Sequence, residues 1–315
     1  MTVKIFGRLA QRVPGWLAAL AFAAALTGCA AVSTTALNSM EPDGGVVATR
    51  DIVFQDGRRG ALDVYRPPDA DGHSPVVVFY YGGSWTFGAR WQYAFLGKAL
   101  ARRGVVVVIP DYRLYPEVRW PSFLEDCARA AAWAKAHAAD YGGDPKQMFL
   151  MGHSAGAYNA LMLAEDPRWL RGAGMDPSDL RGVIGLAGPY EFPQRRPRGL
   201  RPIFEPGAAD RIEPIDYADG RGPPLLLATD DHDDKVSPTA TLHMADKVRA
   251  AGGEVEVREY PGLSHVLLVG ALAAPLRHQA PVLQDILDFV RSHAALTARA
   301  PTVAGQATPA TPATP

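Results

Sequence analysis

The sequence predicts an α/β fold in which a mostly parallel central sheet carries helices on both faces. Short apolar runs, typical of strands that are covered on both sides, alternate with segments of helical periodicity along most of the chain. The chain has 315 residues, of which 48% are hydrophobic, so it can build one large core. Parallel strands need crossover helices between them, and this alternation therefore indicates a layered sheet with right-handed crossovers.

The predicted strands follow from apolar patterning. The first two flank Asp56-Gly57, a dipeptide typical of a hairpin turn. Most of the others are continuous apolar runs, whereas the last alternates between polar and apolar residues. We expect strands at residues 51–54, 61–65, 75–81, 105–110, 148–151, 183–187, 225–229 and 254–260.

The predicted helices lie between these strands and after the last one. Gly104 and the Gly252-Gly253 pair terminate two of them, and the last carries a clear apolar face. We expect helices at residues 91–103, 123–140, 237–251 and 281–295, and another that starts after Ser154. Residues 188–224 are rich in proline, glycine and arginine without periodicity, which predicts a small lid or insertion.

A targeting signal is predicted at the N-terminus. Lys4, Arg8 and Arg12 precede an apolar run at residues 16–26, which is shorter than the ~20 residues that span a bilayer. The run is followed by Thr-Gly-Cys ending at Cys29, and this segment resembles the lipobox of bacterial lipoproteins. The resemblance implies cleavage before Cys29 and lipidation of its thiol. An ordinary cleavage site with an incidental cysteine is the alternative.

This resemblance implies a location and a domain organisation. Several acyl chains on one residue would anchor the protein stably in a bacterial cell envelope, and Ala30 after the cysteine favours the periplasmic side of the outer membrane. The expected segments are a signal peptide at 1–28, a tether at 29–46, the α/β domain at 47–296 and a disordered Ala/Thr/Pro tail at 297–315.

A nucleophilic serine is predicted at Ser154. The segment Gly152-His153-Ser154-Ala155-Gly156 lies between an apolar strand and a helix, the arrangement of a nucleophile elbow. Its glycines are needed where strand and helix nearly touch, and the serine sits in a strained turn at the strand end. A serine hydroxyl is a weak nucleophile at neutral pH and needs a base within hydrogen-bond reach.

His265 is the predicted base because it follows the last strand, at the edge where Ser154 lies. The base in turn needs a carboxylate that orients it. Four acids, Asp230, Asp231, Asp233 and Asp234, follow one strand, and the residues alone do not choose among them.

At this point the chain resembles the α/β-hydrolase fold. Its Gly-x-x-Asp-x-x-Val-type loop places the acid three residues before a valine, which here is Val236, so the resemblance selects Asp233. Asp230 departs from that pattern, because a glycine is usual there. The order Ser154, Asp233, His265 is the α/β-hydrolase order.

The turn Tyr81-Gly82-Gly83-Ser84-Trp85 resembles the His-Gly-Gly-x-Trp turn of carboxylesterases of the hormone-sensitive-lipase type and of their relatives, prenylcysteine methylesterases and kynurenine formamidases. The resemblance implies an oxyanion hole made by the N–H groups of Gly83, Ser84 and Ala155. Tyr81 replaces the usual histidine, which braces this loop in the family, so we expect the bracing to differ.

The sequence therefore predicts a serine hydrolase that cleaves small carboxylic esters through an acyl-enzyme, without a cofactor. Arylformamidase or peptidase-type amide hydrolysis remains an alternative, as does an inactive lipid-tethered binding module. The net charge of −1 and the lack of a long basic run argue against a nucleic-acid partner. The aspartates around His232 lack a second ligand group at a recognisable spacing, so no metal site is predicted. The oligomeric state is left open.

Overall fold

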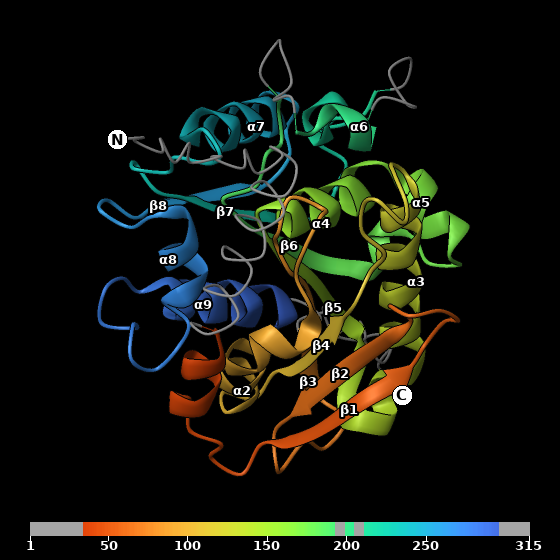
Figure 1. Cartoon of the computed structure of the whole chain (residues 1–315), viewed down its shortest axis with the longest axis vertical. Helices are drawn as coiled ribbons and strands as arrows, with labels where there is room; N and C mark the ends of the chain where they lie inside the picture. Colours follow the sequence, from red (N-terminus) through yellow and green to blue (C-terminus); the bar gives the residue numbers. More distant parts are fainter. Residues whose placement is uncertain (1–33, 193–198, 205–210, 296–315) are drawn as a thin grey trace, which may run out of the picture.

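A computed structural model describes residues 34–192, 199–204 and 211–295 (Figure 1). The predictions for the signal peptide at 1–28, for lipidation at Cys29 and for the tail at 297–315 lie outside the described residues. The predicted domain and most of the predicted insertion lie within them.

One sheet organises the described residues, with the strand order β1-β2-β4-β3-β5-β6-β7-β8. β2 runs antiparallel to both of its neighbours, and every pair from β4 to β8 is parallel. The α/β class with a mostly parallel sheet is confirmed. The strands are β1 (Val47–Val53), β2 (Ala61–Arg66), β3 (Ser74–Tyr80), β4 (Val106–Pro110), β5 (Gly143–His153), β6 (Leu180–Leu186), β7 (Leu225–Thr229) and β8 (Val255–Glu259).

Helices cover both faces of the sheet. Figure 1 shows α2, α8 and α9 on one side and α3, α4 and α5 on the other, while α7 packs on β7 and β8. The helices are α2 (Ala94–Ala101), α3 (Ser122–His137), α4 (Ala155–Glu165), α5 (Pro167–Gly172), α6 (Arg201–Phe204), α7 (Pro238–Ala250), α8 (His265–Gly270) and α9 (Val282–Ala295). Residues 34–40 are also helical.

The apolar patterns explain the layers. All residues of β4 and β7 are buried, as expected for strands that are covered on both faces. On α9 the predicted apolar face, which includes Val282, Ile286 and Val290, is turned into the core. The hydrophobic core therefore lies on both sides of the central strands.

β1 is longer than its pattern predicts. It is an edge strand whose residues are mostly exposed, so it lacks the apolar alternation that identifies a strand. Asp51 has a positive φ of 58°, and the pairing register with β2 shifts between Thr49 and Ile52. An exposed strand with such an irregularity does not alternate between apolar and polar residues, so residues 47–50 are not recognised as a strand from the sequence.

The described part of the predicted insertion packs into the domain. Ile203 and Phe204 of α6 are completely buried, and the Ile203 carbonyl accepts a hydrogen bond from the Trp120 N–H over 3.0 Å. The Phe204 ring meets the ring of Trp85 edge-on, with centroids 4.9 Å apart. The insertion therefore contacts the turn that follows β3.

Residues 34–46, predicted as part of a tether, instead pack against the domain. Glu41 is only 3% exposed; its Oε1 lies 2.6 Å from the Arg277 guanidinium and its Oε2 accepts a hydrogen bond from the Ala274 N–H. The Asn38 side chain bonds to the backbone of Trp91 and of Phe95. The tether prediction is wrong for these residues, because Glu41 meets a partner, Arg277, that lies far away in the sequence.

Replacement of Glu41 by alanine should reduce the free energy of unfolding by about 1.5–3 kcal/mol, because it removes charge-assisted hydrogen bonds and leaves the Arg277 guanidinium without its carboxylate partner. The matched control is Asp43→Asn, which removes an ion pair between Lys98 and the exposed carboxylate of Asp43 and should have a smaller effect. Urea unfolding of both variants measures the difference. Equal stabilities would mean that this segment is a tether after all.

Candidate active site

Ser154 occupies a sharp turn between β5 and α4. Its φ of 55° and ψ of −122° lie outside the regions that a serine normally adopts. The turn is held by a hydrogen bond from the Ser154 N–H to the Leu186 carbonyl at the end of β6, over 2.8 Å. The serine is therefore fixed at the carboxyl end of the central strand.

The glycines on either side of the serine are required by close backbone contacts. A Cβ atom on Gly156 would lie 1.9 Å from the Tyr80 carbonyl oxygen, and one on Gly152 would lie 2.1 Å from the Gly156 carbonyl oxygen. Only glycine leaves the room for these approaches. The elbow thus draws the start of α4 against the end of β3.

His265 and Asp233 form a buried pair at the same edge of the sheet. Asp233 follows β7 and His265 is the first residue of α8, which comes after β8. The His265 Nδ1 lies 2.6 Å from Asp233 Oδ2, and the two side chains are 9% and 0% exposed. An ionised carboxylate only accepts, so Nδ1 carries the proton and Nε2 of the neutral ring is left as an acceptor.

Of the four acids that compete in the sequence, Asp233 is the one that contacts His265. Burial alone would raise the pKa of Asp233, but hydrogen bonds from His265 and from the Val236 and Lys235 N–H groups outweigh it and lower the pKa. Asp233 is therefore held as a carboxylate beside the imidazole.

The other three acids make different contacts. Asp230 is buried, and this burial, together with a smaller effect of the nearby Asp233 charge, raises the pKa of Asp230. Asp231 accepts a hydrogen bond from the Gly262 N–H over 2.8 Å, which ties the loop after β7 to the loop after β8. Asp234 pairs with Lys235 on the surface. These contacts are structural and none of them reaches the His265 ring.

A contact through His153 places His265 beside the elbow. The His153 Nε2 lies 2.8 Å from the His265 carbonyl oxygen, and the two rings are 4.8 Å apart between centroids. Within the described part of the chain, the Ser154 hydroxyl makes no hydrogen bond. Nucleophile–base hydrogen bonds often tighten only when substrate is bound.

The turn after β3 lies against the serine. A Cβ atom on Gly82 would lie 3.0 Å from the Ser154 Cβ, and Gly83, Ser84 and Trp85 follow with positive φ angles of 128°, 50° and 57°. Among the described residues, the backbone N–H groups of Gly83, Ser84 and Ala155 donate no hydrogen bond. These are unoccupied donors beside the serine.

Trp85 anchors this turn to the elbow helix α4. It is 2% exposed, and its indole Nε1–H donates a hydrogen bond to Asn159 Oδ1 of α4 over 3.0 Å. The Tyr158 ring meets it edge-on at 5.1 Å, and the Trp85 carbonyl accepts from the Tyr115 N–H. The positive φ angles are therefore supported by packing, by the hydrogen bond that Trp85 donates to the elbow helix and by the one that it accepts from Tyr115.

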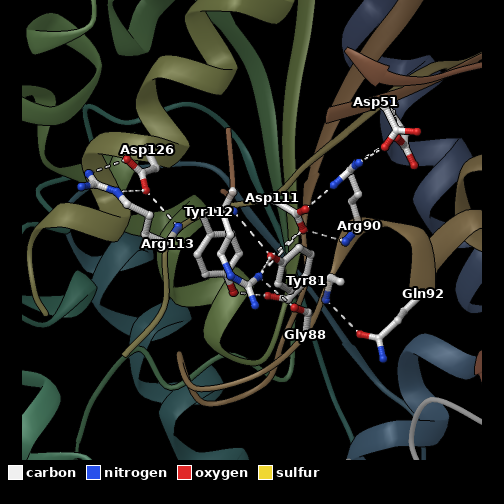
Figure 2. A network of polar contacts seen from close by, with 12 residues as sticks. Asp51, Tyr81, Gly88, Arg90, Gln92, Asp111, Tyr112, Arg113 and Asp126 are labelled. Carbon is white, nitrogen blue, oxygen red and sulfur yellow. Dashed lines mark hydrogen bonds and ion pairs between the residues drawn. The ribbon is translucent and has the colours of Figure 1, made fainter. Parts of the chain in front are cut away.

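Tyr81, which replaces the family histidine, braces the other side of the turn (Figure 2). Its hydroxyl donates to Asp111 Oδ1 over 2.9 Å and accepts from Arg59 over 3.1 Å. Its carbonyl accepts from the Tyr112 hydroxyl over 2.6 Å. Burial and, to a smaller extent, the nearby charge of Asp111 raise the pKa of the Tyr81 phenol, which stays a neutral donor.

Arg90 extends this network toward the edge of the sheet. Its guanidinium pairs with Asp111 and Asp51 (Figure 2). It also pairs with Asp63, at 2.9 Å. On the far side of Tyr112, Arg113 makes a bidentate pair with the fully buried Asp126, with both contacts at 2.8 Å. The network thus links the turn to β1, β2 and α3.

Sequence reasoning missed several of these supporting residues. His153 has no sequence signal that assigns it a role of its own, although its position next to Ser154 places it at the site. Arg90 and Asn159 carry no local signal, because their partners lie on strands and turns distant in sequence. Asp111 is different, because the segment Asp111-Tyr112-Arg113-Leu114 resembles the loop that supports the oxyanion turn in the same esterase branch, and this resemblance predicts a structural role for it. In the structure Asp111 and Tyr112 both contact Tyr81.

The described residues contain neither a candidate metal site nor a candidate membrane-spanning helix. In residues 34–192, 199–204 and 211–295 no three His, Cys, Asp or Glu side chains gather in a way that would hold a metal ion. Among the same residues, no helix combines the length and apolar character required to cross a bilayer.

Curated relatives match most of the chain. An isoprenylcysteine α-carbonyl methylesterase of Arabidopsis thaliana is 30% identical over 266 residues, which cover 77% of this chain and 62% of the relative. The probable carboxylic ester hydrolase LipM of Mycobacterium tuberculosis is 30% identical over 257 residues, which cover 74% of this chain and 59% of the relative. The chain thus spans less than two thirds of the length of these relatives.

Solved structures share the fold. Esterase B from Lactobacillus rhamnosis, inhibited by a tributyrin phosphonate, superimposes with a TM-score of 0.78 at 19% identity, covering 90% of this chain and 97% of that one. An esterase from Pyrobaculum calidifontis gives a TM-score of 0.69 at 23% identity, covering 86% and 92% of the two chains. The α/β-hydrolase fold expected from the sequence is confirmed. The BD-FAE family model matches residues 62–248, more than half of the sequence, and the chain therefore belongs to the BD-FAE family.

Proposed function

We propose that the chain is a serine hydrolase that cleaves carboxylic esters through an acyl-enzyme. The observation that carries the proposal is the 2.6 Å contact between His265 Nδ1 and Asp233 Oδ2 at the strand edge where Ser154 sits in its elbow. The pair leaves the other ring nitrogen of His265 free to act as a base.

In the first half of the reaction, Nε2 of His265 takes the proton of the Ser154 hydroxyl as its oxygen attacks the ester carbonyl. The carbonyl oxygen gains a negative charge, which the N–H groups of Gly83, Ser84 and Ala155 stabilise. Asp233 stabilises the imidazolium by holding Nδ1–H. The tetrahedral intermediate then collapses, and His265 gives its proton to the departing alcohol.

The second half repeats this chemistry with water. His265 takes a proton from a water molecule that attacks the acyl-enzyme carbonyl, and the same N–H groups hold the oxyanion. The bond to the Ser154 oxygen breaks, the acid product leaves, and the proton on His265 returns to the serine. No cofactor enters at any step.

Esters are favoured over amides as substrates by the names of the relatives. Those that match most of this chain are methylesterases and carboxylic ester hydrolases. The same triad chemistry cleaves amides, so the choice has to be measured. The backbone N–H donors of Gly83 and Ser84 and the nucleophile Ser154 would serve both ester and amide hydrolysis.

We also propose that Cys29 is lipidated and holds the enzyme on the periplasmic side of the outer membrane. The basic residues, the apolar run and the small residues before Cys29 support this. Four residues separate Cys29 from Thr34, a length that spans at most about 17 Å when fully extended. An anchored domain would therefore work close to the bilayer surface.

Replacement of Ser154 by alanine should lower kcat/KM for p-nitrophenyl acetate roughly 10⁴-fold or more and abolish labelling by a fluorophosphonate, because both need the hydroxyl. The control is Ser264→Ala, which removes a hydroxyl next to His265 that caps no helix N–H. Wild-type activity on an aryl ester and on an N-formyl aryl amide is compared in parallel. Labelling of the Ser154→Ala variant would exclude this serine from the reaction.

Replacement of Asp233 by asparagine should lower kcat/KM by roughly 10³–10⁴-fold, because the amide no longer orients and stabilises the His265 imidazolium. The matched changes Asp230→Asn, Asp231→Asn and Asp234→Asn should retain most of the activity, since those carboxylates do not contact the ring. Steady-state kinetics on the four variants measures this. A large loss at one of the other positions alone would assign the acid elsewhere.

Replacement of Cys29 by serine should move the protein from the membrane fraction to the soluble fraction of its bacterial host and prevent incorporation of an alkyne fatty acid. The matched control is Cys127→Ala, since Cys127 is buried in α3 and inaccessible to a lipid transferase. Fractionation and metabolic labelling test both variants. A Cys29→Ser protein that still carries the fatty acid would overturn the lipidation proposal.

A further inference from the structure

His153, the residue directly before Ser154, makes an unusual contact. It is 5% exposed and ends β5, and its Nε2 lies 2.8 Å from the main-chain carbonyl oxygen of His265. A carbonyl oxygen only accepts hydrogen bonds, so Nε2 must carry a proton and donate it. The nucleophile's neighbour thus holds the backbone of the proposed base.

The charge state of His153 suits this contact. Burial and, to a smaller extent, the nearby charge of His265 lower the pKa of His153 to about 3. The ring is therefore neutral at physiological pH. Its Nδ1 is then an unprotonated nitrogen, buried and without a partner among the described residues. A neutral donor holds the carbonyl without placing a second positive charge beside the His265 imidazolium.

The segment that carries the base is only partly buried, and a hydrogen bond from the Gly262 N–H to Asp231 ties it to the loop after β7. His265 follows Pro261 and Gly262, both exposed, and precedes Val266, which is 66% exposed. β5 lies in the middle of the sheet between β3 and β6 and pairs with both of them. A hydrogen bond from the end of β5 to the first residue of α8 ties this segment to the strand that carries Ser154.

We propose that His153 is a positioning residue that fixes the backbone of His265, while Asp233 fixes its ring. The base is then held at two points, the main-chain oxygen and Nδ1, and its remaining nitrogen keeps a constant distance from the Ser154 hydroxyl. This inference rests on the proposed hydrolase function. His153 itself touches neither the substrate nor a reacting atom.

Two substitutions of similar length separate the donor from the packing. Gln at position 153 places an amide N–H near the original Nε2, whereas Met fills the same space without a donor. His153→Met should lower kcat roughly 10- to 100-fold, because small misplacements of a catalytic group have effects of this size. KM should change little, and His153→Gln should retain most of the kcat of the wild type.

A second readout does not depend on turnover. The Nδ1 proton of His265, shared with Asp233, should give a sharp downfield proton resonance in ¹⁵N-histidine-labelled protein. We expect the signal to persist in the wild type and in His153→Gln, and to broaden in His153→Met because the ring is no longer held in one place. Asp233→Asn, which perturbs the partner of this proton, identifies the signal.

Three outcomes decide between the accounts. A loss of kcat and a broadened signal in the Met variant alone support the positioning role. Equal kcat values and equal signals in the Gln and Met variants overturn it, since the donor then makes no difference. If the wild type hydrolyses no ester and is not labelled by a fluorophosphonate, the proposed function fails, and the Nδ1 signal still decides whether His153 positions His265.

Discussion

The close approach of three backbone segments at the elbow is the constraint on which the rest of the site depends. Gly156 passes so near the Tyr80 carbonyl that a single Cβ atom would collide with it, and this approach draws the end of β3 against the start of α4. The Gly82-Gly83 turn follows directly on β3 and therefore lies beside Ser154. Within the described residues, the N–H groups of Gly83, Ser84 and Ala155 have no backbone partner, which is what an oxyanion requires.

The strained segments are held by contacts on both sides. Trp85 is fixed to α4 through Asn159, and Tyr81 is fixed to the sheet edge through Asp111 and Arg90. The phenol of Tyr81 thus reaches a buried carboxylate on the neighbouring strand end, where the family's histidine braces the same loop. A backbone with several positive φ angles in succession is stable only when its surroundings determine it in this way.

Much of the fold could be predicted because buried parallel strands and crossover helices leave local patterns. Each predicted strand corresponds to one strand of the structure, and the α9 face was identified from its spacing. β1 was predicted too short because an exposed edge strand with an irregular register between Thr49 and Ile52 has no pattern to recognise. The short helices α5, α6 and α8 were missed, because a few residues do not establish a period.

Those site residues could be predicted that lie in a sequence motif and follow one another in the chain order of the fold. Roles that depend on contacts between residues distant in sequence could not be predicted. The position of Asp233 relative to Val236 distinguished it from three neighbouring acids, and in the structure it is the acid that meets His265. Docking of residues 34–46 depends on Glu41 meeting Arg277, a residue more than two hundred positions away. The role of His153 likewise depends on a carbonyl that the sequence cannot place next to it.

The most direct measurement of the central claim is a crystal structure of the enzyme after reaction with a phosphonate ester. The account predicts phosphorus bonded to the Ser154 oxygen and a phosphoryl oxygen about 2.7–3.1 Å from the N–H groups of Gly83, Ser84 and Ala155. It also predicts that Nε2 of His265 faces the ester oxygens of the adduct. A phosphoryl oxygen that points away from these N–H groups, or an imidazole turned away from the adduct, would contradict it.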